Sequence, residues 1–265
     1  MIRRDMRPQS DSPVSQWALI QQIDHAHLAG QLAEHWGTSG FAPLEPRGEL
    51  LWAIYHHDDG WRAWDLDPRI EPSHHRPAGF TEMQASQSLA IWTESIEIAA
   101  AAGPLQAYAV AGHFSVLARR LAAWNSDPAE AELAISFVAE YDRRRAAWLA
   151  EWSALEPEKN TPEVADRAVA QLQFFDALSL WVCCSEKPEP DEVPSPAGPV
   201  LTLDPLDSQR IVLAPWPLTI EVLNLEVPAR LVPAQAYVSQ AELAAAPSQS
   251  LRLRWQLLPP TAKAP

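Results

Sequence analysis

The composition of this chain changes abruptly near residue 185, and that change limits the folds open to it. Residues 185–199 contain five prolines and four acidic residues. Proline removes a backbone donor and fixes one backbone dihedral angle, so a stretch rich in proline does not continue a helix. Helical patterns precede this stretch and strand patterns follow it. The sequence therefore predicts a helical part over 1–185, an acidic linker over 186–199 and a β part over 200–265.

The helical part carries start and stop signals in close succession. The predicted helices span residues 16–36, 50–61, 83–102, 104–124, 127–155 and 161–184. Ser15 is a suitable N-cap for the first helix, and Gly37 is a suitable stop. Thr81 and Gln84 have the spacing of a capping box before the third. Six helices with short connections, apart from a loop over 62–79 that contains three prolines, predict a helical bundle.

The β part is predicted from short runs of alternating apolar and polar residues. These runs span residues 200–203, 210–213, 218–227, 229–232 and 251–258. The last run alternates cleanly, as a sheet with one solvent-exposed face requires. We therefore expect a mainly α protein, in which a helical bundle carries a small C-terminal antiparallel β-unit.

Charge and cysteine content exclude several classes of protein. Lys and Arg number 20 against 34 Asp and Glu, a net charge of -14, which repels phosphate backbones and argues against nucleic-acid binding. The two cysteines, Cys183 and Cys184, are neighbours and make no disulfide framework. The N-terminus lacks the apolar run of a secretory signal, and no apolar stretch is long enough to span a bilayer. We expect a cytoplasmic protein that binds neither nucleic acid nor membrane, with a homo-oligomer left open.

Histidine and aspartate stand side by side near the end of the second predicted helix. His57 and Asp58 both approach the apolar face of that helix, whereas the run 56–59 as a whole has the composition of a solvated helix end. A carboxylate near a helix C-terminus opposes the helix dipole and favours a compensating cation. His25 in the first helix has small alanine neighbours that leave room for an ion. Imidazole and carboxylate together suit Mn, Fe, Zn or Mg.

A third carboxylate lies within an apolar stripe. Asp176 falls among the buried positions of the last predicted helix, and a buried carboxylate without a partner costs several kcal/mol. It therefore needs a metal ion or a cationic side chain, for which Arg119 and Arg120 are the alternatives. His113 also falls on an apolar face. Either a hydrogen-bonded core histidine or a metal ligand explains it.

These residues resemble the pattern of the HD-domain superfamily of metal-dependent phosphohydrolases. That pattern has a His on one helix, a His-Asp pair on the next and an Asp on a much later helix. Its positions here are His25, His57, Asp58 and Asp176. The wider sequence also resembles an uncharacterised bacterial family, domain-of-unknown-function family 3891. That likeness is carried by four segments: Gln22-Ile-Asp-His-Ala, His57-Asp-Asp-Gly-Trp, Phe174-Phe-Asp-Ala-Leu-Ser-Leu and Pro215-Trp-Pro.

The resemblance implies an HD-domain-like helical bundle and a metal-dependent hydrolase of a small phosphate ester or phosphoanhydride. It implies a divalent transition metal, as one or two ions of Fe, Mn, Zn or Ni, with Mg also compatible. The candidate metal ligands are His25, His57, Asp58, His113 and Asp176, and the candidate catalytic residues are His56, His113 and Asp59. In members with two metals further histidines contribute, for which His113 and then His74 or His75 are available.

Two other functions are compatible with the same residues. The same superfamily contains di-iron oxygenases, which implies an oxidase of a small polar substrate as one alternative. The acidic linker and the added β-unit suit a non-catalytic binding or assembly protein as the other. The sequence contains no Gly-x-Gly-x-x-Gly, Walker loop or Gly-x-Ser-x-Gly motif, which argues against nucleotide-binding and serine-hydrolase functions.

Overall fold

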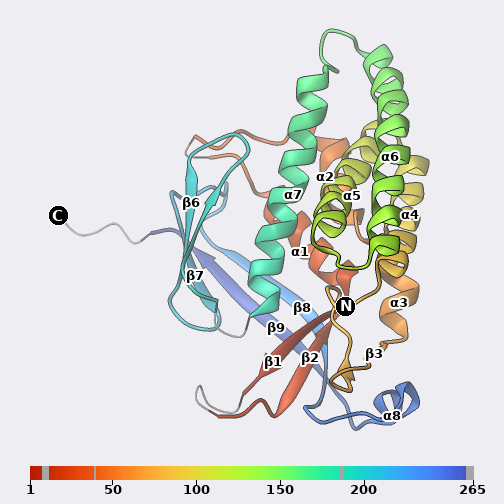
Figure 1. Cartoon of the computed structure of the whole chain (residues 1–265). Helices are drawn as coiled ribbons and strands as arrows, with labels where there is room; N and C mark the ends of the chain where they lie inside the picture. Colours follow the sequence, from red (N-terminus) through yellow and green to blue (C-terminus); the bar gives the residue numbers. More distant parts are fainter. Residues whose placement is uncertain (8–11, 39, 186–187, 261–265) are drawn as a thin grey trace, which may run out of the picture.

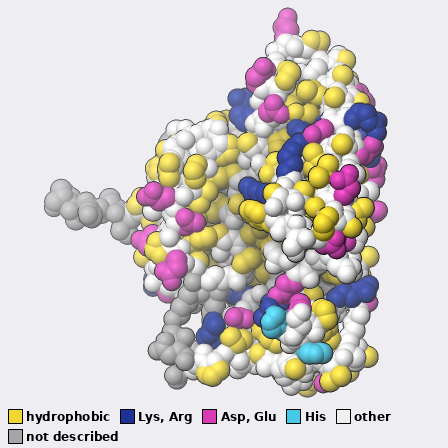
Figure 2. Space-filling view, viewed as in Figure 1, with side chains coloured by type: hydrophobic (Ala, Val, Ile, Leu, Met, Phe, Trp, Pro, Cys, Tyr) yellow, Lys and Arg dark blue, Asp and Glu magenta, His cyan; other side chains and the backbone are white. Residues whose placement is uncertain are grey.

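The computed structural model describes residues 1–7, 12–38, 40–185 and 188–260, and it contains a helical layer and a large curled sheet (Figure 1). The long helices stand side by side, and the strands from both ends of the chain lie together beside and below them. On the face shown in Figure 2, basic and acidic side chains are interspersed over the helices, and apolar surface extends toward the strands.

Helices form most of the first 185 residues. They are α1 (Gln22–Glu34), α2 (Arg47–His56), the short 3-10 turn η1 (Asp59–Trp61), α3 (Arg62–Leu66), α4 (Ala85–Ala102), α5 (Pro104–Trp124), α6 (Pro128–Leu155) and α7 (Pro162–Cys184), and α8 (Gln240–Ala245) follows much later. The last three predicted long helices are confirmed to within one residue at each end. Helix α4 begins later than predicted, because Gln84 is its N-cap and forms the capping box with Gln87 rather than with Thr81.

The main sheet has seven strands. They are β1 (Ile2–Met6), β2 (Gln16–Ile20), β5 (Asp191–Pro194), β6 (Val200–Pro205), β7 (Arg210–Ala214), β8 (Leu223–Pro233) and β9 (Gln249–Leu258), in the order β1-β2-β8-β9-β7-β6-β5. All neighbours pair antiparallel except β7 and β9, which are parallel. A separate pair of short strands, β3 (Ile70–Glu71) and β4 (Arg76–Pro77), lies in the loop between α3 and α4.

The expected fold class, a mainly α HD-domain-like bundle with a small C-terminal antiparallel β-unit, is wrong. The chain is 50% helix and 21% strand, and the sheet is mixed and takes its first two strands from the N-terminus. Residues 16–20 were predicted as the start of a helix, but they form β2. Such a short apolar run fits both the period of a helix and the period of a strand. Pairing with the long strand β8 makes it a strand.

The predicted linker over 186–199 also contains a strand. Residues 186 and 187 lie outside the described residues, but β5 follows them and pairs with β6 at the edge of the sheet. Edge strands tolerate proline because one side of the backbone needs no partner, and Pro194 ends this one. The sheet thus takes strands from both sides of residue 185.

One hydrophobic core joins the helices to the sheet. It includes Leu28 of α1, Ile54 of α2 and Phe175 of α7, together with Trp255 of β9. Arg4 of β1 adds a polar connection, because its buried guanidinium donates to the carbonyls of residues 182 and 183 at the end of α7. Within the described ranges, every helix is too short or too polar to cross a membrane.

Candidate metal centre

Four helices bring histidine and aspartate side chains to one buried place. His25 comes from α1, His57 and Asp58 follow the last residue of α2, His113 comes from α5 and Asp176 from α7. The first four are buried, and Asp176 is the most exposed, with 13% of its side chain accessible. The structure therefore gathers all five residues that the sequence predicts as ligands.

The distances join these side chains into one cluster. His25 Nε2 lies 2.8 Å from Asp58 Oδ2 and 3.8 Å from Asp176 Oδ1. His57 Nε2 lies 3.5 Å from Asp58 Oδ2 and 3.3 Å from Asp176 Oδ1. The rings of His57 and His113 are adjacent, with centroids 5.3 Å apart. Two overlapping groups result, His25–His57–Asp58 and His57–His113–Asp176, and the ligand atoms within each lie within 4.8 Å of one another.

Backbone contact fixes which nitrogen of His57 faces the cluster. His57 Nδ1 lies 2.9 Å from the carbonyl oxygen of Ile54. A carbonyl only accepts, so Nδ1 carries the proton, and in the neutral ring Nε2 presents a lone pair. That Nε2 is buried and has no hydrogen-bond partner among the described residues, and the same is true of His113 Nδ1. Each of the two overlapping groups therefore contains a buried nitrogen without a hydrogen bond.

The carboxylates and imidazoles of the cluster shift one another's pKa values. Burial alone would lower the pKa of His57, but the carboxylates of Asp58 and Asp176 raise it to about 9. Burial alone would raise the pKa of both carboxyl groups, but the surrounding imidazoles lower them instead. For His113 burial dominates and lowers the pKa to about 4. The cluster thus combines ionised carboxylates and a neutral His113 with a positively charged His57, which is protonated on both ring nitrogens at neutral pH.

The donor set fits a divalent transition metal. Two ligand atoms about 2.1 Å from one ion lie about 3.0 Å apart at a right angle and about 3.4 Å apart at a tetrahedral angle. The four separations between imidazole nitrogen and carboxylate oxygen span 2.8 to 3.8 Å, which brackets those values. An ion would also provide a partner for the nitrogen of His57 that now lacks one.

Two of the predicted catalytic residues lie beside this cluster and pair with each other. His56 Nδ1 is 2.9 Å from Asp59 Oδ2, and the ring of His56 stacks on Trp52. Asp59 also accepts a hydrogen bond from Arg62 at 2.9 Å. Neither His56 nor Asp59 belongs to the two groups of ligand atoms, so their predicted catalytic role stays a prediction.

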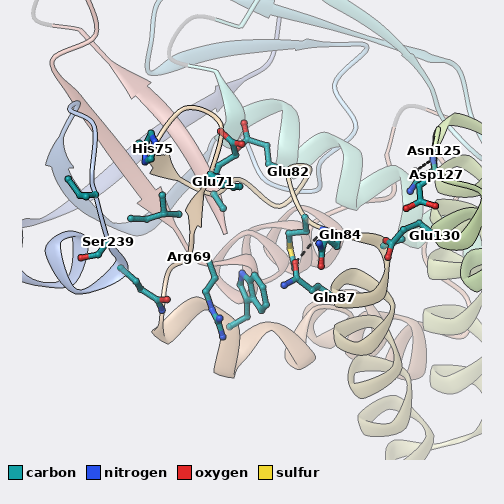
Figure 3. Close-up of a pocket in the computed structure, with 18 residues that line it drawn as sticks. Arg69, Glu71, His75, Glu82, Gln84, Gln87, Asn125, Asp127, Glu130 and Ser239 are labelled. Atoms are coloured by element: carbon teal, nitrogen blue, oxygen red, sulfur yellow. Dashed lines mark hydrogen bonds between the residues drawn. The ribbon is translucent and has the colours of Figure 1, made fainter.

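The other histidines that the sequence offered for a second ion lie elsewhere. His74 is exposed and pairs with Glu71. His75 lines an open cavity of about 820 Å³, which extends to the first turns of α4 and α6 (Figure 3). There, Glu130 accepts from the backbone of residue 86, and Asp127 caps α6. No member of the cluster lines this cavity.

Among the described residues, neither Arg119 nor Arg120 forms an ion pair with Asp176. Arg119 forms an ion pair with Asp142, at 2.6 Å, whereas Asp176 faces His25 and His57. The carboxylate of Asp176, which is only partly accessible, therefore meets imidazole, which binds either a proton or a metal ion.

Sequence reasoning missed two residues that shape the cluster. Ser179 is buried, and its Oγ lies 2.9 Å from His25 Nδ1. Its only signal was its place three positions after Asp176 in the same apolar stripe. Gly60 lies next to the backbone of α4, and its N–H donates to Ser95 Oγ at 3.0 Å. Only the packing of η1 against α4 shows that position 60 has no room for a side chain.

Replacement of Gly60 by alanine should destabilise the protein and disturb the cluster. A Cβ there would lie 2.4 Å from the carbonyl oxygen of Ile91 and 2.6 Å from the nitrogen of Ser95, so η1 must move away from α4. We expect a loss of about 1–3 kcal/mol in the free energy of unfolding, measured by urea titration. The control is Gly48→Ala, because a Cβ at Gly48 in α2 meets nothing within 4 Å and alanine favours the helix. Equal stabilities for the two variants would contradict the close packing of η1.

Comparison with known proteins gives a family. Residues 10–234 match a family described as protein of unknown function (DUF3891). The chain belongs to this family. No curated protein and no solved structure matches. The match confirms the predicted membership of DUF3891 and includes all five cluster residues, whereas β1 and β9 lie outside it. The resemblance to the HD-domain superfamily stays a prediction.

Proposed function

We propose that this DUF3891 protein is a metal-dependent hydrolase of a small phosphate ester or phosphoanhydride. The observation that carries the proposal is the arrangement around His57 Nε2. This buried nitrogen has no hydrogen-bond partner among the described residues, yet two carboxylate oxygens lie within 3.5 Å of it. The negative charge of these two carboxylates converges on this nitrogen and attracts a cation, which is either a proton or a metal ion.

His25, His57, Asp58 and Asp176 would hold the ion, and His113 is available as a further ligand. A bound divalent metal supplies an electrophile for a phosphoryl oxygen and lowers the pKa of a coordinated water toward neutrality. The protein itself fixes the ligands. His57 is held by a backbone carbonyl, and His25 by Ser179. Such contacts orient the ligand nitrogens before an ion arrives.

The burial of the cluster favours one direction of approach. Its histidines and Asp58 are almost fully enclosed, and Asp176 is the most accessible member. A substrate would therefore reach the ion from the Asp176 side. Enclosure on the other sides excludes bulk water, which strengthens the electrostatic interactions within the site.

Metal content and phosphatase activity test this proposal. The purified protein should contain about one or two equivalents of a transition metal, measured by elemental analysis. After chelation and reloading with Mn, Fe, Co, Ni, Zn or Mg, it should hydrolyse p-nitrophenyl phosphate or an inorganic phosphoanhydride. Asp58→Asn should lose both metal and activity, whereas His74→Ala, which alters an exposed histidine outside the cluster, should keep both.

Two contrary results would favour other functions. A protein that takes up no metal under any of these conditions would overturn the metal centre and leave a binding or assembly role. A protein that binds iron, changes colour with oxygen and hydrolyses no phosphate compound would overturn the hydrolase and favour an oxygenase.

A further inference from the structure

Ser179 lies between a candidate ligand and the helix that carries another. Its buried Oγ is 2.9 Å from His25 Nδ1 on α1 and 2.8 Å from the backbone carbonyl oxygen of Asp176, one turn earlier in α7. Both distances are those of a hydrogen bond. The hydroxyl therefore has two partners, one of which is the ring nitrogen of His25 that faces away from Asp58.

The partner of His25 differs in kind from the partner of His57. The carbonyl of Ile54 can only accept, so it commits His57 to the Nδ1–H form. A serine hydroxyl both donates and accepts, and its hydrogen rotates to suit. Ser179 can therefore satisfy His25 Nδ1 whether or not that nitrogen carries a proton.

We propose that Ser179 is a positioning residue that lets His25 alternate between donating to Asp58 and binding a metal ion. The inference rests on the proposed metal centre. Without an ion, His25 Nε2–H donates to Asp58 Oδ2 across 2.8 Å, and the Ser179 hydroxyl donates to Nδ1. With an ion, Nε2 presents its lone pair, Nδ1–H donates to Ser179 Oγ, and the hydroxyl donates to the carbonyl of Asp176.

The ring keeps one proton throughout this exchange. The proton on Nε2 leaves and another binds Nδ1, by exchange with water, so no net proton is released by His25. Heavy atoms need not move, because the partners of both arrangements are already in place. The contact between Ser179 and His25 serves both, the contact with Asp58 serves the metal-free arrangement, and the contact with the Asp176 carbonyl serves the metal-bound one. In the metal-bound arrangement, the hydroxyl also connects the His25 ring to the turn of α7 that carries Asp176. Ser179 thereby orients two ligands from one position.

The test combines zinc titration with ¹⁵N spectra of the histidine side chains. Wild-type protein should show the Nε2–H form of His25 without metal and the Nδ1–H form with Zn²⁺, while His57 keeps Nδ1–H in both. Ser179→Ala should bind Zn²⁺ about 10–100-fold more weakly, as loss of a group that orients a ligand usually does. Ser179→Thr retains a hydroxyl and should recover most of the affinity.

Ser115→Ala is the matched control. Ser115 is also fully buried on a helix, but its Oγ has no hydrogen-bond partner among the described residues. Its removal should leave Zn²⁺ affinity unchanged. The proposal is overturned if Ser179→Ala binds Zn²⁺ as tightly as wild type, or if His25 keeps one form with and without Zn²⁺.

Failure of the metal centre is distinguishable from failure of this inference. Wild-type protein that takes up no Zn²⁺ would overturn the proposed function. The metal-free spectra then still test the contact itself, because loss of the hydroxyl should shift the Nδ1 resonance of His25 in Ser179→Ala. An unchanged resonance would overturn the role of Ser179 independently of any metal.

Discussion

Replacing His57 by glutamine should weaken metal binding by more than about 100-fold, the largest loss expected at any single ligand. Removal of a group that merely orients a ligand costs 10–100-fold, so loss of a ligand that belongs to both groups should cost more. Glutamine retains a donor for Asp58 and Asp176, which limits the repulsion between the two carboxylates. Zn²⁺ titration after chelation, with activity assayed on the same samples, measures both effects.

A graded set of variants separates one bound ion from two. His113→Ala should remove one equivalent of metal and leave the other if His113 belongs to a second position, because it occurs only in the group with His57 and Asp176. With a single ion, His113→Ala should lower affinity less than His57→Gln and leave the stoichiometry unchanged. His74→Ala serves as the control on the surface. Equal and small losses for His57→Gln and His74→Ala would refute a metal centre at this place.

The sequence predicts the cluster better than it predicts the fold around it. Asp176 could be found because a helix has a fixed period, and a carboxylate within an apolar stripe stands out. Asp58 could be found because its charge opposes the dipole of the helix that precedes it. Both arguments are local, and both residues are indeed held close to imidazoles. The further step to a bound metal stays a proposal.

The fold was predicted less well because its sheet depends on distant segments. Strand β1 was not predicted at all, and β2 was assigned to a helix, because five-residue segments carry little periodic signal. They become strands through pairing: β2 bonds to β8, more than 200 residues later, and β1 then bonds to β2. The parallel contact between β7 and β9 is equally non-local.

The contacts that orient the candidate ligands could not be predicted from the sequence either. The role of Ser179 requires the relative rotation of α1 and α7, and the role of the Ile54 carbonyl requires the rotamer of His57. Neither follows from a helical period. Gly60 likewise acquires its role from the distance between η1 and α4.

The metal-free protein should lose stability as the pH rises from about 6.5 to about 9. His57 has a pKa of about 9 in the folded protein, against 6.5 as its ordinary value. Below pH 6.5 both states hold the proton, and the stabilisation is fully present. Between the two values only the folded state holds it, and stabilisation on the order of 3 kcal/mol is lost as the pH rises through 9.

The other members of the cluster change the stability of the protein at lower pH. Asp58 and Asp176 have pKa values below the usual 3.8, so their contribution is present above that value and is lost as the pH falls below it. The pKa of His113, lowered to about 4, favours unfolding as the pH falls from 6.5 toward 4, because only the unfolded state is then protonated. The contribution of the cluster to stability should therefore be greatest near pH 6.5.

Urea titrations between pH 4 and 10 in the presence of a chelator measure how stability depends on pH. The variant His57→Gln should not show the decline in stability above pH 6.5.

The same titrations with Zn²⁺ provide the decisive comparison. An ion on Nε2 replaces the proton of His57, so its binding releases that proton and becomes more favourable as the pH rises. The zinc-loaded protein should consequently gain stability relative to the metal-free protein across the interval in which the latter declines. Parallel profiles with and without Zn²⁺ would mean that the ion does not bind at His57.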